Sequence, residues 1–137
     1  MSVAMQGEGS EAAAHELSAE ALAEEIARWA AEKKAHEIVE IDLRGMAAFT
    51  DRFVICSGNT ERQTKAIHDA ILGGLRSSHG LRPRRVEGLS QSHWILMDYL
   101  DVVVHIFTPQ TREFYRLEAL WGEAPTRRFD EPAGALA

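Results

Sequence analysis

The spacing of apolar positions switches between helical and strand-like several times along the chain, and each switch predicts an element. Residues 18–34 begin with a serine suited to capping a helix, and their apolar side chains recur every three or four residues on one face. Residues 37–43 alternate apolar with acidic side chains, which predicts a half-buried strand. Residues 53–56 are apolar throughout, which is typical of a central strand covered on both faces.

A second long helix is predicted to begin after residue 59, because Thr60 and Gln63 have the spacing of a capping box. Gly80 is placed to end it. The helix contains two adjacent glycines, Gly73 and Gly74, and each weakens a helix by about 1 kcal/mol relative to alanine. Since Gly74 falls on the apolar face, we expect the helix to pack closely against the sheet there.

The next part of the chain predicts a short strand and then a hairpin. A strand is predicted around residues 84–87, and residues 93–107 form two β-rich runs that turn near Tyr99 and Leu100, as in an antiparallel hairpin. By alternation, both faces of this hairpin are largely apolar. One face can pack on the helices, and the other must be covered by a helix or by a partner unless both are simply core.

A last helix is predicted from the pair Thr108 and Pro109, because proline favours the first helical turn. Phe114, Leu117 and Trp121 would share its buried face. The predicted order is therefore αββαβββα, an α/β fold with a mixed β-sheet and packed helices.

The length and composition fit a single domain over residues 18–122, with residues 1–17 and 123–137 predicted to be disordered tails. Residues 1–18 lack the basic and apolar segments of a signal peptide, and no apolar run approaches the roughly 20 residues of a membrane span. The single cysteine excludes an internal disulfide. We therefore expect a cytoplasmic protein that is not bound to a membrane.

The net charge of −6 argues against a surface that binds nucleic acid as a whole, because phosphate binding relies on a positive field. A local basic patch does occur at Arg82, Arg84 and Arg85. It is either a solvated edge strand or a small contact for RNA phosphates.

Several patterns invite a catalytic interpretation. Asp98 and Asp101 form a D-x-x-D pair that could hold a cation or serve acid–base chemistry, but no third acid lies nearby and the pair equally suits a solvated turn. Ser57-Gly58, between a strand and a helix, resembles the phosphate-binding turn of nucleotidyltransferases. Those enzymes also need an acid pair on the next strand, where residues 84–87 supply two arginines and one glutamate.

Cysteine chemistry is the remaining enzymatic interpretation. Cys56 with His68 or His105 could form a nucleophile and its base. However, a thiol inside an apolar strand is usually buried and inert. A binding protein without metal or other cofactor is therefore the favoured interpretation, and Trp and Tyr flanked by acids on the hairpin are residue types that anchor protein interfaces.

Five segments carry a resemblance to a known family. The chain resembles the ribosomal silencing factors (RsfS, also called Iojap) over roughly residues 20–122, through residues 42–44 (DLR), 50–59 (TDRFVICSGN), 94–99 (WILMDY), 101–107 (DVVVHIF) and 112–121 (REFYRLEALW). The resemblance implies a nucleotidyltransferase-like fold without catalytic acids, and a homodimer when free. It also implies binding to the fourteenth large-subunit ribosomal protein, where it prevents the small subunit from joining and lowers translation when nutrients are short.

Carried onto this chain, the resemblance assigns partner contacts to five residues of the hairpin: Trp94, Met97, Asp98, Tyr99 and Asp101. Leu100 departs from the family pattern, which often has glycine there. Because leucine is strained at positive φ, we expect a looser or different turn. Two alternatives stay open: a large-subunit assembly factor that uses the same contact, and a nucleotide-dependent enzyme on the related fold.

Overall fold

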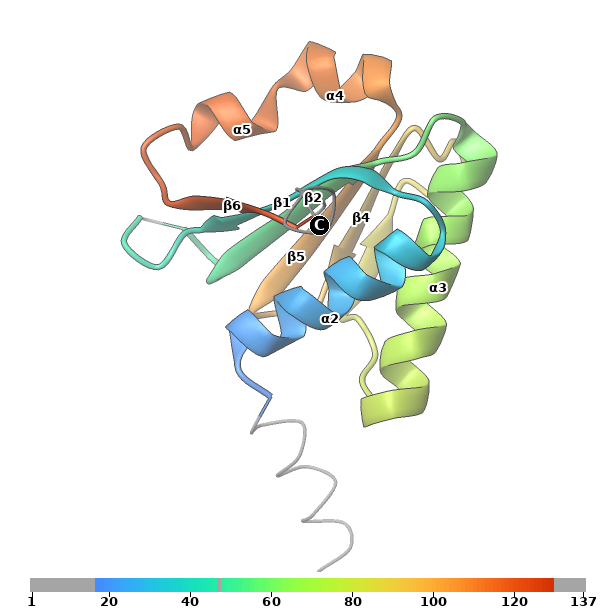
Figure 1. Cartoon of the computed structure of the whole chain (residues 1–137), viewed down its shortest axis with the longest axis horizontal. Helices are drawn as coiled ribbons and strands as arrows, with labels where there is room; N and C mark the ends of the chain where they lie inside the picture. The colour runs from blue at the N-terminus through green and yellow to red at the C-terminus, as the bar shows by residue number, and fades with distance from the viewer. Residues whose placement is uncertain (1–16, 47, 130–137) are drawn as a thin grey trace, which may run out of the picture.

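The computed structural model describes residues 17–46 and 48–129 (Figure 1). Its helices and strands follow in the order α2 (Ala19–Glu32), β1 (His36–Asp42), β2 (Arg52–Ser57), α3 (Glu61–His79), β3 (Arg85–Glu87), β4 (Trp94–Asp98), β5 (Val102–Phe107), α4 (Pro109–Tyr115), α5 (Leu117–Leu120) and β6 (Thr126–Arg128). The strands form one six-stranded sheet in the order β3-β4-β5-β2-β1-β6. Only the β2–β5 pairing is parallel, so the predicted mixed sheet is confirmed.

The two long helices begin where their capping residues predict. The Ser18 hydroxyl accepts a hydrogen bond from the backbone N–H of Ala21 at 3.0 Å, and the Thr60 hydroxyl accepts one from that of Gln63 at 3.1 Å. Gly80 ends α3 in the left-handed conformation, at φ 64°. The Gln63 amide also donates to the carbonyls of Lys33 and Lys34, which directly follow α2, so the end of one helix is tied to the start of the other.

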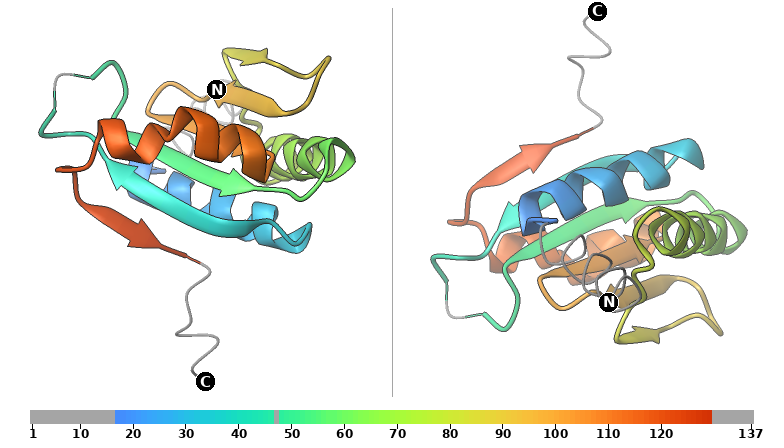
Figure 2. Two further views of the ribbon diagram at one scale, coloured as in Figure 1. Left: turned by 90° about the horizontal axis from the view of Figure 1, so that it is seen from above. Right: turned by 90° about the horizontal axis from the view of Figure 1, so that it is seen from below.

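The core lies on both faces of the sheet. Every residue of β2 and β5 is buried. On one face their side chains pack with α2 and α3, and on the other they pack with side chains from β1, Leu117 and Trp121. Figure 2 shows α4 and α5 lying across the second face, with β3 and β4 to one side of them. The predicted central strand at residues 53–56 is therefore confirmed.

The predicted last helix is in fact two short helices. Arg116 takes a left-handed conformation (φ 48°) between α4 and α5, which changes the direction of the chain. Leu117 and Trp121 pack against the sheet as predicted, but Phe114 is 79% exposed. A single helix would have placed all three on one face, and the break at Arg116 prevents it.

The sequence prediction places the start of the disordered C-terminal tail too early in the chain. Residues 126–128 form β6, which pairs antiparallel with β1, so the observed order is αββαβββααβ. The Arg127 guanidinium reaches the carboxylates of Glu40 (2.9 Å) and Glu24 (3.2 Å), which ties β6 to β1 and α2. At the other end, Leu17 already packs on the core. The predicted disorder of residues 1–16 and 130–137 lies outside the described residues.

Gly74 packs against a neighbouring helix rather than against the sheet. A Cβ built on Gly74 would lie 2.1 Å from Cε2 of Trp29 on α2, whereas one built on Gly73 would meet nothing within 4 Å. The expectation of close packing was correct, but its partner is α2.

Substituting each of these glycines by alanine should therefore have opposite effects. Gly74→Ala should lower the free energy of unfolding by about 1 kcal/mol or more, because displacing the Trp29 ring outweighs the gain in helix propensity. Gly73→Ala should raise it by about 0.5–1 kcal/mol. Urea unfolding of the two variants checks this, and equal effects of the same sign would contradict the packing.

Candidate functional site

The β4–β5 hairpin alternates as the sequence predicts. Trp94 pairs with Phe107, Leu96 with His105, and Asp98 with Val103. Ile95, Met97 and Tyr99 face α2 and α3 and belong to the cluster of buried residues on that side. Trp94 and Leu96 lie on the second face, where both are only partly buried.

The five hairpin residues assigned to partner contact differ in their accessibility. Met97, Asp98 and Tyr99 are 0%, 1% and 5% exposed, so these side chains offer almost no surface in this conformation. Trp94 is partly buried and Asp101 is exposed. Trp94 and Asp101 are thus the accessible members of the set, whereas Met97, Asp98 and Tyr99 are buried in the fold. Partner contact by these five residues stays a prediction.

The Asp98 carboxylate is fully used by the chain itself. One oxygen accepts a hydrogen bond from the Arg84 guanidinium at 3.0 Å, and the other accepts the backbone N–H of Leu100 at 2.8 Å. Among the described residues, no group of three or more His, Cys, Asp or Glu side chains could hold a metal ion. The arrangement supports the interpretation of Asp98 as a residue that builds the turn.

The expectation was a looser or different turn, and the hairpin turn is in fact tight. The backbone N–H of Tyr99 donates to the Val102 carbonyl at 2.9 Å, and that of Asp101 donates to the Tyr99 carbonyl at 3.0 Å. Leu100 adopts φ 77° between them. The hydrogen bonds around the turn impose this conformation, although leucine disfavours it.

Trp94 stands at the centre of an aromatic group on the second face. Its ring centroid lies 4.9 Å from that of Phe107 and 4.6 Å from that of Tyr115, whose ring lies 5.0 Å from that of Phe114. Tyr115 is 50% exposed and Phe114 79% exposed. We call the surface formed by Trp94, Leu96, Phe114 and Tyr115 the open face.

Sequence reasoning missed the contribution of Phe114 and Tyr115 to this surface. The available signal was that neighbouring helical residues point roughly 100° apart, so the single face predicted to hold Phe114, Leu117 and Trp121 does not include Tyr115.

His105, on the neighbouring strand β5, holds the Trp94 ring through a hydrogen bond. The Trp94 indole N–H donates to Nδ1 of His105 at 3.1 Å, so the imidazole carries its proton on Nε2. His105 is 4% exposed, and burial lowers its pKa to about 4. The imidazole is therefore neutral at physiological pH. It faces the opposite side of the sheet from Cys56, which excludes the proposed pairing of these two residues.

The nucleotidyltransferase-like turn is occupied by protein groups. The Ser57 hydroxyl accepts a hydrogen bond from the Arg112 guanidinium at 2.8 Å, and Arg112 also forms an ion pair with Glu118 at 2.7 Å. The serine is 2% exposed. This arrangement uses Ser57 to anchor α4 against the end of β2.

The basic patch is partly neutralised. Arg84 pairs with Asp98, and Arg85 lies 3.2 Å from Glu87, yet both arginine side chains remain 57% exposed. Arg82 is exposed as well. The patch lies along the β3 edge of the sheet, beside the open face. Separately, no helix within the described ranges is long and apolar enough to span a membrane.

Comparison with known proteins identifies the family. The family model described as "Ribosomal silencing factor during starvation" (RsfS) matches residues 16–136. The chain belongs to the RsfS family. It is 43% identical to "Ribosomal silencing factor RsfS" of Halalkalibacterium halodurans over 96 residues, which cover 69% of this chain and 80% of that protein.

Two further likenesses extend the RsfS assignment. A crystal structure of a Bacillus halodurans protein superposes with a TM-score of 0.65 at 36% identity, covering 76% of this chain and 93% of that one. A mouse protein named "Mitochondrial assembly of ribosomal large subunit protein 1" is 30% identical over 111 residues, which cover 77% of this chain and 46% of that protein.

The burial of Tyr99 generates one prediction. Its hydroxyl is buried and has no hydrogen-bond partner among the described residues, and burial raises the pKa of Tyr99. Tyr99→Phe should therefore leave the free energy of unfolding unchanged or raise it by up to about 1 kcal/mol. Chemical denaturation measures this, and a loss of more than about 1 kcal/mol would show that the hydroxyl is bonded.

Because the His105 imidazole is neutral in the fold, the stability of the protein should depend on pH. In the unfolded chain the His105 imidazole takes up a proton near pH 6.5, whereas in the folded chain it does so only near pH 4. The stability that the neutral imidazole confers is therefore lost as the pH falls through this window. The wild type should lose about 3 kcal/mol more than His105→Gln between pH 6.5 and 4. Parallel pH dependence of unfolding in the two proteins would contradict the burial of a neutral imidazole.

Proposed function

We propose that this chain binds the large ribosomal subunit through the open face and represses translation by keeping the small subunit from joining. The proposed partner is the fourteenth large-subunit ribosomal protein, at the surface where the small subunit docks. The observation that carries the proposal is an exposed aromatic patch, centred on Trp94, on a sheet face that the short helices α4 and α5 cover only in part.

The chemistry of the open face suits a protein partner. Trp and Tyr are enriched among the residues that contribute most to protein–protein binding. Leu96 and Trp94 are held on a strand that pairs on both sides, so little ordering of the backbone is needed on binding. The membership of the RsfS family points the same way.

The charge of the chain suits a basic partner. A net charge of −6 and the exposed Asp101 favour approach to a positively charged ribosomal protein, while surrounding RNA phosphates repel the bulk of the domain. The three arginines at the β3 edge (Arg82, Arg84 and Arg85) would then make a peripheral contact with ribosomal RNA. This site of action is in the cytoplasm.

The proposed mechanism depends only on the size of the folded domain. A folded unit of this length has a radius of gyration near 13 Å and is about 30 Å across. A wedge of that size between two subunit faces that meet closely blocks their association without catalysis, metal or cofactor. We accordingly propose a binding protein and not an enzyme.

The same face suits self-association when the protein is free. An aromatic patch on an isolated domain is stabilised by burial against a second copy. A homodimer formed in this way would have to dissociate before docking, so the apparent affinity for the subunit would fall as protein concentration rises.

A role in large-subunit assembly is the second candidate. It is favoured by the mouse relative, whose name refers to assembly of the mitochondrial large subunit. The same contact would serve both roles, and they differ in whether the subunit is mature when the protein binds.

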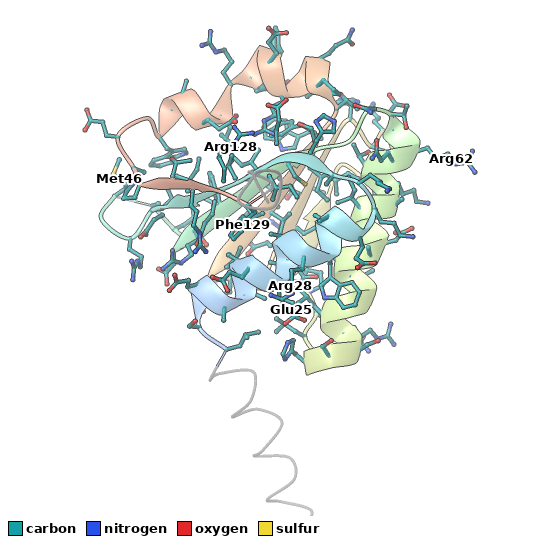
Figure 3. The ribbon with its side chains drawn as sticks, viewed as in Figure 1. Glu25, Arg28, Met46, Arg62, Arg128 and Phe129 are labelled. Atoms are coloured by element: carbon teal, nitrogen blue, oxygen red, sulfur yellow. The ribbon has the colours of Figure 1, made fainter. Side chains whose placement is uncertain are left out.

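A matched pair of tryptophan substitutions tests the open face. Trp94→Ala should weaken binding to purified large subunits by about 2 kcal/mol, roughly thirtyfold, because it removes the central aromatic side chain. Trp29 is also partly buried but packs against the core cluster on the other face, and its indole N–H donates at 3.2 Å to Glu25 of α2, which Figure 3 labels. Trp29→Ala should lose comparable stability and keep wild-type affinity.

Fluorescence titration with labelled protein measures both affinities, and circular dichroism confirms that both variants are folded. If folded Trp94→Ala binds large subunits with wild-type affinity, the open face is not part of the binding site.

A further inference from the structure

The tip of the β4–β5 hairpin holds an exposed leucine in a conformation that leucine rarely adopts. Leu100 has φ 77°, and the backbone N–H of Asp101 donates to the carbonyl of Tyr99 at 3.0 Å. A hydrogen bond between residues two apart around a positive φ defines the rare, strained form of the γ-turn. Glycine adopts this conformation freely, whereas a Cβ crowds the neighbouring carbonyl oxygen.

Hydrogen bonds within the hairpin and from residues 50–52 impose the conformation. The N–H of Leu100 donates to Asp98, and its carbonyl accepts the Thr50 hydroxyl, both at 2.8 Å. The Asp101 carbonyl accepts the N–H groups of Asp51 (3.2 Å) and Arg52 (3.1 Å). At positions 100 and 101 these bonds use backbone atoms alone, so glycine at position 100 would keep every one of them.

The Leu100 side chain contributes little to the packing of the core. It is 51% exposed and belongs to neither cluster of core residues in the described chain. The isolated domain therefore carries backbone strain for a side chain that it hardly buries. Backbone strain clusters at binding and switch positions, and among the non-glycine residues with positive φ in the described chain only Leu100 has an apolar side chain.

The surroundings of Leu100 indicate the chemistry of that contact. Phe49, which precedes the hydrogen-bonded Thr50, is 70% exposed. Asp51 and Asp101 are exposed beside them. Two apolar side chains beside exposed carboxylates suit an apolar depression on a basic protein surface, whereas the half-exposed Arg84 on the Asp98 side of the turn belongs to the peripheral RNA contact.

We propose that Leu100 and Phe49 form a second contact with the same ribosomal protein, pre-positioned by the strained turn. This inference rests on the proposed function. Six residues of extended chain separate Leu100 from Trp94, or about 20 Å. A standard interface of about 800 Å² per partner is wide enough to include both. Because the turn is already fixed, the leucine docks without an ordering cost.

The test compares glycine substitutions at two strained positions. Lys34 also has positive φ (65°) and is exposed, but it precedes β1 near the end of β2, whereas Leu100 lies near the start of β2 at the opposite end of the sheet. Leu100→Gly and Lys34→Gly should each raise the melting temperature by roughly 2–6 °C, because both relieve strain. Only Leu100→Gly should weaken binding to purified bacterial large subunits, by about fivefold or more.

Phe49→Ser gives an independent measurement, since it removes an apolar side chain without changing backbone strain. It should weaken subunit binding while leaving the melting temperature near the wild-type value. Wild-type affinity in both Leu100→Gly and Phe49→Ser overturns this inference and leaves the proposed function intact.

Three other results are equally decisive. A melting temperature of Leu100→Gly that stays constant or falls overturns the inference, because the leucine is then not strained. Loss of self-association alone, measured by analytical ultracentrifugation, assigns the tip to a second copy of the chain and also overturns it. Failure of the wild type itself to bind large subunits contradicts the proposed function instead.

Discussion

The rest of the structure depends on the parallel pairing of β2 with β5, two strands buried along their whole length on both faces of the sheet. Such a pair needs apolar cover on both sides. The helices α2 and α3, of 14 and 19 residues, cover one side. On the other, α4 and α5 have only 7 and 4 residues, and the adjoining strand β4 keeps Trp94 and Leu96 partly uncovered. The open face is therefore a consequence of short helices over the buried central strands of the sheet.

Polar groups beneath and beside the open face keep it rigid. His105 accepts the indole N–H of Trp94, and the buried Asp98 carboxylate holds both Arg84 and the turn at Leu100. These residues carry charge or hydrogen-bonding capacity that the sequence alone suggests for catalysis or direct contact. In the fold each makes hydrogen bonds within the chain, and the surface beside them is apolar and already ordered.

The local signals in the sequence predict most of the fold. Ser18 and Thr60 cap helices through their own side chains, and strict alternation assigns the two faces of the hairpin, so neighbouring residues suffice in both cases. The rest depends on distant partners. Strand β6 has no apolar pattern and is placed by its pairing with β1 and by the ion pair of Arg127 with Glu40. Asp98 looks like a surface acid until Arg84 is brought beside it, and the break at Arg116 leaves no signal in its residue type.

The central claim is that a rigid wedge with an apolar open face occupies the joining surface of the large ribosomal subunit. Sucrose-gradient sedimentation of purified large and small subunits, with and without the protein, tests it most directly. The account predicts that the protein co-migrates with the large subunit and that the peak of joined ribosomes falls as protein is added. Joined ribosomes that form undiminished while the protein remains at the top of the gradient would contradict it.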